Sequence, residues 1–101
     1  MSVDPTEWLI REVVDLLEVS SVGLYEFVWL LRGRYPNMSQ AESHARAAEA
    51  LQRLLARQEG LLIWQTWPAE CAVMGPSVDA PGPGDWRDPR DGVPYLALAR
   101  N

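Results

Sequence analysis

The sequence predicts an α+β fold in which three helices pack on a two-stranded antiparallel sheet. Three observations support this prediction. Apolar residues recur at helical spacing over three segments before residue 60. Two short apolar runs follow, of the kind that forms strands. The residues between those runs are rich in proline, glycine and aspartate, which favours a loop. With 101 residues, we expect a single domain over 1–101.

The first helix is expected at residues 5–18. Asp4 can cap this helix, Pro5 suits its first position, and Glu7 has the spacing that completes a capping box. Its apolar residues recur at helical spacing: Leu9, Ile10, Val13, Val14, Leu16 and Leu17. This face is predicted to pack on the core.

The second helix is expected at residues 21–33, after a break at 19–21. Gly33 is placed to act as the C-cap of this helix, and Pro36 cannot continue the helix. Apolar residues extend around most of its circumference. We therefore expect it to be the central and most buried helix, with Trp29 in the core.

The third helix is expected at residues 39–58, with Ser39 and Glu42 at capping-box spacing and Gly60 just beyond its end. Its predicted inner face is small and aliphatic: Ala41, Ala48, Leu51, Leu54 and Leu55. Its outer stripe alternates acidic and basic residues: Glu42, Arg46, Glu49, Arg53 and Arg57. Two pairs in this stripe, Glu42 with Arg46 and Glu49 with Arg53, have the acidic residue four positions before the basic one. Such a pair stabilises a helix by about 0.3–0.5 kcal/mol.

Two strands are expected at residues 61–67 and 94–99, joined by a long loop at 69–92 that is rich in Pro, Gly and Asp. Trp64 and Trp67 differ by an odd number of positions, so a regular strand places them on opposite faces. Both cannot pack on the same helices. The second face needs a cover, which either the Trp86 loop or a partner supplies.

Three helices followed by two strands is the element order of a winged helix. The segment LQRLLARQEGLLIW, residues 51–64, resembles the end of a winged-helix recognition helix that runs into its first wing strand. One feature departs from this pattern. Residues 36–60 leave room for a single long helix, whereas a DNA-binding winged helix needs a short helix, a turn and a recognition helix. The segment GLYEFVWLLRGRYP, followed by WP, also resembles small actinobacterial proteins, which implies a bacterial source and no particular activity.

The composition argues against several classes of function. The net charge is −5 and all nine basic residues are arginine, so the chain attracts basic partners and repels nucleic-acid phosphates at long range. Cys71 and His44 are the only cysteine and histidine, too few for a disulfide or a structural zinc site. The sequence has neither a signal-peptide pattern nor an apolar run of about 20 residues. We therefore expect a cytoplasmic protein that does not enter a membrane.

No arrangement of residues typical of catalysis is visible. Ser43 and His44 are adjacent, and side chains adjacent on a helix point about 100° apart, so they cannot form a nucleophile–base pair. The carboxylates are scattered, and no glycine loop opens a helix. We predict that the protein is not an enzyme and that it uses no cofactor and no metal.

Five tryptophans are more than a core of this size can enclose, which favours a protein-binding role. The predicted partner-binding residues lie in or near the acidic loop: Trp64, Trp67, Asp85, Trp86, Asp88 and Asp91. Trp86 is either an exposed anchor or a cover for the sheet, and the loop is either a binding element or a solvated linker.

These observations support a non-catalytic, acidic protein-binding module, such as a small inhibitor or a toxin-immunity protein that binds a partner with a basic surface. An unpaired sheet edge could also join two copies in a homodimer. The alternative is a winged-helix transcriptional regulator that binds DNA through the helix at 39–58. Its arginines are neutralised by glutamates, which makes a nucleic-acid partner the weaker hypothesis.

Overall fold

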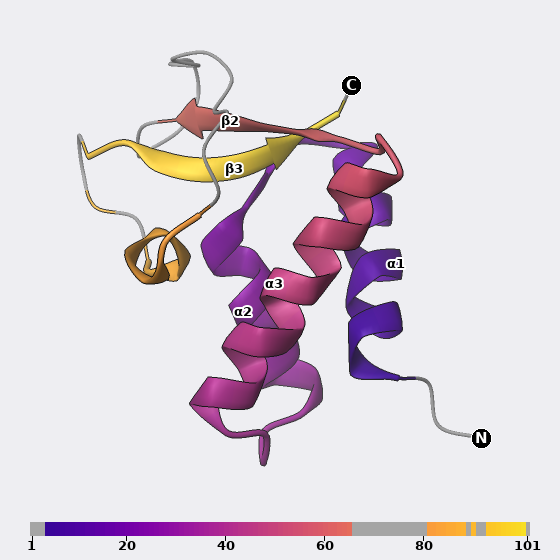
Figure 1. Cartoon of the computed structure of the whole chain (residues 1–101), viewed down its shortest axis with the longest axis vertical. Helices are drawn as coiled ribbons and strands as arrows, with labels where there is room; N and C mark the ends of the chain where they lie inside the picture. Colours follow the sequence, from indigo (N-terminus) through magenta and orange to yellow (C-terminus); the bar gives the residue numbers. More distant parts are fainter. Residues whose placement is uncertain (1–3, 66–80, 89, 91–92, 101) are drawn as a thin grey trace.

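The computed structural model describes residues 4–65, 81–88, 90 and 93–100. The elements, in chain order, are α1 (Pro5–Leu17), β1 (Val22–Gly23), α2 (Leu24–Arg34), α3 (Gln40–Ala56), β2 (Leu61–Gln65), the short 3-10 helix η1 (Pro83–Trp86) and β3 (Tyr95–Ala99). Figure 1 shows the three long helices on one side of the sheet, with η1 next to α2. The predicted α+β class is confirmed.

The sheet has three antiparallel strands in the order β1-β3-β2, whereas the sequence predicted two. The additional strand, β1, has two residues, and Val22 lies opposite Leu98 of β3. Leu62 of β2 lies opposite the same Leu98, so β3 is the central strand. A two-residue strand is too short to produce an alternating pattern, which explains why the sequence did not reveal it.

The start of α2 also differs from the prediction, because β1 occupies the residues immediately before it. Residues 22 and 23 belong to the sheet, so α2 begins at Leu24 rather than at residue 21. The Glu26 carboxylate accepts a hydrogen bond from the Gly23 backbone N–H at 2.6 Å. The helix then continues through Gly33 to Arg34, so Gly33 does not end it as predicted.

The caps of the other two helices are confirmed. The Asp4 carboxylate accepts hydrogen bonds from the backbone N–H groups of Thr6 and Glu7. The Ser39 hydroxyl accepts one from the Glu42 backbone N–H at 3.1 Å. These contacts satisfy donors that the first turn of a helix cannot pair internally.

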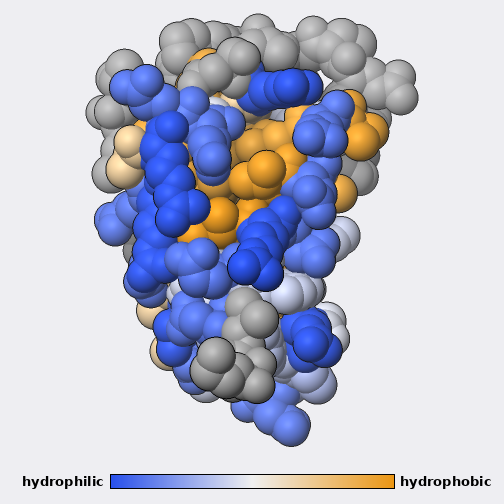
Figure 2. Space-filling model, turned by 90° about the vertical axis from the view of Figure 1, so that its right-hand side faces the viewer, coloured by the Kyte–Doolittle hydropathy of each residue, from blue (hydrophilic) through white to orange (hydrophobic). Residues whose placement is uncertain are grey.

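The core lies between the helices and the adjacent face of the sheet. Its largest fully buried side chains come from all three helices and from the sheet: Leu9, Val13, Phe27, Leu31, Leu54, Leu96 and Leu98. The predicted inner face of α3 is partly wrong. Ala41 is exposed, and Ala47 and Ala50 are buried instead. Figure 2 shows that, on the right-hand side of Figure 1, apolar surface lies between two columns of hydrophilic side chains.

Candidate functional site

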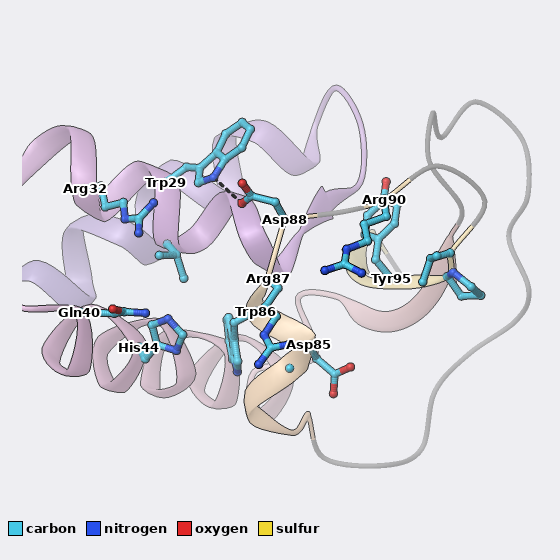
Figure 3. Close-up of a pocket in the computed structure, with 14 residues that line it drawn as sticks. Trp29, Arg32, Gln40, His44, Asp85, Trp86, Arg87, Asp88, Arg90 and Tyr95 are labelled. Atoms are coloured by element: carbon cyan, nitrogen blue, oxygen red, sulfur yellow. Dashed lines mark hydrogen bonds between the residues drawn. The ribbon is translucent and has the colours of Figure 1, made fainter.

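A hollow of about 740 Å³ lies between α2, α3 and η1. Its lining brings together aromatic and basic side chains from distant parts of the chain: Trp29, Arg32, His44, Trp86, Arg87 and Tyr95. Figure 3 shows Arg32 extending from α2 and His44 extending from α3 into the space between these helices, with Trp86 of η1 beside it. Residues far apart in the sequence therefore share one concave surface.

Trp29 lies at this hollow and is exposed, with 49% of its surface accessible, which contradicts the prediction that it belongs to the core. On α2 the buried residues are Leu24, Tyr25, Phe27, Val28 and Leu31. Trp29 lies about 40° beyond Tyr25, at the edge of this buried face. Its position at the edge of the apolar stripe was the signal in the sequence, but Tyr25 is also near that edge and is buried.

The exposed Trp29 ring is held in place by two contacts. Its indole N–H donates to the Asp88 carboxylate at 2.9 Å, as Figure 3 shows. The ring also packs edge-on against Tyr25 at 4.9 Å between ring centroids. These two contacts favour one orientation of a large aromatic side chain at the surface.

Trp86 is buried, whereas one of its two predicted roles was an exposed anchor. Only 8% of its surface is accessible, and its ring packs edge-on against Phe27 at 6.1 Å. Of the two interpretations of this residue, the exposed anchor is wrong. Trp86 belongs to the core cluster on the helical side of the sheet, so it does not supply the cover for the opposite face.

Three arginines at the hollow have no ion pair within the part of the chain that the structure describes: Arg32, Arg87 and Arg90. All three are exposed. The two aspartates in the lining have other roles. Asp85 accepts a hydrogen bond from the Gly82 backbone N–H at 2.7 Å, and Asp88 accepts the bond from Trp29. The hollow therefore offers cationic groups.

The other residues predicted for partner binding lie apart from the hollow or outside the described residues. Trp64 is half-buried and packs against the core cluster. Its β2 neighbour Leu62, two positions away on the same strand face, is buried in that cluster. Trp67 and Asp91 fall outside the described residues. β2 is the last strand in the sheet order, and a homodimer through this edge stays a prediction.

A polar network joins the hollow to the sheet. The Tyr95 hydroxyl donates to the Gln65 side-chain carbonyl at 3.1 Å, and the Gln65 amide donates to the Ser21 hydroxyl at 2.8 Å. Tyr95 also packs against Tyr25 at 5.8 Å. Burial, followed by the negative charge of Glu26, raises the pKa of Tyr95 and raises the pKa of Tyr25 to about 12. Both phenols are therefore neutral at physiological pH.

The charged stripe of α3 lies elsewhere and faces α1. Arg53 pairs with Glu49 on its own helix at 2.6 Å, as predicted, and also with Glu7 of α1 at 2.6 Å. Arg46 pairs with Glu42 and with Asp4. The most exposed residues of α3 are different: Gln40, Ala41, Glu42, Ala45, Gln52 and Ala56. None of them is basic.

The structure also describes Ser43 and His44, the residues considered for catalysis. The buried Ser43 hydroxyl donates to the Ser39 carbonyl oxygen at 3.0 Å, and His44 lines the hollow. Within residues 4–65, 81–88, 90 and 93–100, no three His, Cys, Asp or Glu side chains form a metal-binding group. No helix in that part of the chain has the length and apolarity needed to cross a bilayer.

The chain matches no protein-family model, and no curated protein or solved structure is significantly similar to it.

Proposed function

We propose that this protein is a non-catalytic protein-binding module and that the hollow beside Trp29 is its binding surface. The observation that carries this proposal is the state of Trp29, which is 49% exposed and yet held by Asp88 and Tyr25. Ordering a free side chain costs about 0.5–1.5 kcal/mol on association. A tryptophan whose surface orientation is already favoured by two contacts avoids part of this cost.

The composition of the hollow supports the same proposal. Tryptophan, tyrosine and arginine are the residues most often found at the energetic centres of protein interfaces, and the hollow contains all three. The described residues expose four large apolar side chains, and two of them, Trp29 and Val93, line this hollow. Exposed apolar groups that gather around one concavity favour a binding surface over chance exposure.

Among protein-binding modules, we propose a small inhibitor or a toxin-immunity protein that acts in the cytoplasm. The net charge of −5 supports this role, because it speeds association with a partner that is positively charged overall. This attraction acts between whole molecules at long range. The hollow itself is lined by arginines, so the partner segment that enters it must be compatible with positive charge.

The test compares Trp29→Ala with Val19→Ala as baits in source-cell extracts. Val19 is 87% exposed and does not line the hollow, so it is a matched control for losing an exposed apolar side chain. We expect the wild type and Val19→Ala to retain the same partner and Trp29→Ala to lose it. With the purified partner, calorimetry should show a loss of about 30-fold in affinity, as expected for about 2 kcal/mol at an interface centre. Equal affinity of all three proteins would overturn the proposal.

A DNA-binding role is the second candidate, and one observation favours it. α2 and α3 are separated by a five-residue turn at 35–39, which is the order of a helix-turn-helix. Residues 36–60 hold one long helix, α3, as predicted, and α2 takes the place of the preceding helix in this order. However, the arginines of α3 are paired with α1, and a recognition helix needs free donors at its exposed face.

A gel-shift assay at low salt separates the two candidates. The DNA-binding candidate predicts that a duplex is retained by the wild type and released by Arg46→Ala or Arg53→Ala. If no duplex is retained at low salt, this candidate is eliminated.

A further inference from the structure

We propose that the hollow binds an acidic peptide segment, whose carboxylates pair with Arg32, Arg87 and Arg90 while its apolar side chains contact Trp29. This inference rests on the proposed function and names the chemistry of the segment that the partner inserts. For this surface, it replaces the expectation that the partner presents basic groups.

The arginines of the hollow are available for a ligand. Arg46 already pairs with Asp4 and Glu42, and Arg53 with Glu7 and Glu49, whereas the exposed Arg11 and Arg100 are unpaired within the described residues but lie outside the hollow. Those at the hollow are exposed and form no ion pair with a described residue. Figure 3 shows Arg32 and Arg90 directed toward the interior of the hollow from opposite sides. A guanidinium fork matches a carboxylate through two parallel hydrogen bonds, which makes it a specific carboxylate receptor.

The lining of the hollow has a formal excess of one positive charge. Three arginines line it against two aspartates, and the aspartates accept hydrogen bonds from neutral N–H groups rather than ion pairs from these arginines. This locally positive surface belongs to a chain with a net charge of −5. The overall charge repels a long polyanion such as a nucleic acid. A short segment with a few carboxylates is attracted by the arginines of the hollow and is only weakly repelled by the net charge of the whole chain.

The shape and the chemistry of the walls also fit a peptide segment. The volume of about 740 Å³ falls in the range of about 300–1,000 Å³ that is typical of ligand sites. The accessible apolar and aromatic surface comes mainly from Trp29, Val93 and the half-buried Tyr95, because Val28 and Trp86 are almost completely buried. These walls suit a segment in which acidic and apolar residues alternate, rather than a small inorganic anion.

The test uses the full chain and a capped, fluorescent eight-residue peptide with three glutamates and two leucines, read by anisotropy. A second peptide has glutamine in place of each glutamate. We expect at least about 10-fold tighter binding of the acidic peptide, because each charge-assisted hydrogen bond contributes more than a neutral one. The double variant Arg32→Ala/Arg87→Ala should lose at least about 10-fold in affinity for it.

The matched control is Arg11→Ala/Arg100→Ala, which changes the net charge equally at two exposed arginines outside the hollow. It should change the affinity by no more than about 2-fold, the effect of distant charges at physiological salt. Equal losses in the two double variants would overturn the inference, because they would show general charge attraction. A single-stranded DNA that binds more tightly with the same dependence on Arg32 and Arg87 would also overturn it.

The outcomes separate this inference from the proposed function. If Trp29→Ala loses the cellular partner but neither peptide is preferred, the protein-binding role stands and the acidic segment is rejected. If the acidic peptide is preferred but Trp29→Ala retains the partner, the carboxylate site stands and the proposed interface is rejected.

Discussion

Glu26 is a partly buried carboxylate at the start of α2, next to the aromatic residues that support the hollow. Burial raises its pKa above the ordinary glutamate value, and the hydrogen bond from the Gly23 N–H opposes this shift without cancelling it. The folded state therefore holds the Glu26 proton more tightly than the unfolded state. Through this group, stability must decrease as pH rises from the ordinary glutamate pKa through the raised value.

Glu26→Gln removes this titration while it keeps an acceptor for the Gly23 N–H. We expect the unfolding free energy of the variant, relative to the wild type, to increase between about pH 4 and pH 7. Urea unfolding at several pH values measures this difference. A difference that is constant, or that decreases with pH, would contradict the assignment.

At the scale of elements, α1 and α3 are joined at the surface by ion pairs. Arg53 bridges Glu7 of α1 and Glu49 of α3, with its side chain 39% exposed and that of Glu7 40% exposed. Pairs this accessible stabilise a protein by about 0.2–1 kcal/mol because water screens them.

Arg53→Ala should therefore lower the unfolding free energy by about 1 kcal/mol or less, and the loss should shrink at high salt. Arg11→Ala provides the control, because Arg11 is exposed on α1 and forms no ion pair with a described residue. A loss of several kcal/mol, or one that is insensitive to salt, would show that Arg53 has a role beyond these pairs.

The long elements were predictable because each contains several repeats of its own period. The ends of the three helices and of β3 lie within about three residues of the expected ones, and β2 begins at the expected residue 61, while residues 66 and 67 of that predicted strand lie outside the described residues. β1 was missed because two residues contain no period, and Gly33 was misassigned because nothing blocks α2 from continuing one residue beyond it. The hollow was also not predictable, since it joins residues 28–44 to residues 84–95 through tertiary packing.

At the scale of the whole molecule, the two tryptophans of the hollow have different roles, although the sequence predicted Trp29 in the core and left Trp86 as either an exposed anchor or a cover for the sheet. Trp86 completes the core that α2 and β3 share, and Trp29 is the aromatic group presented at the surface. An acidic chain thus carries one locally basic, aromatic concavity. The central claim is that Trp86 serves stability and Trp29 serves binding.

Urea unfolding of Trp86→Ala and Trp29→Ala, side by side, tests this claim most directly. Trp86→Ala should lose about 3–5 kcal/mol, the cost of removing a large buried aromatic, and Trp86→Phe should lose less. Trp29→Ala should lose about 1 kcal/mol or less, because its ring is half exposed. We expect the loss to be larger for Trp86→Ala than for Trp29→Ala. A Trp29→Ala protein that is as destabilised as Trp86→Ala would contradict it.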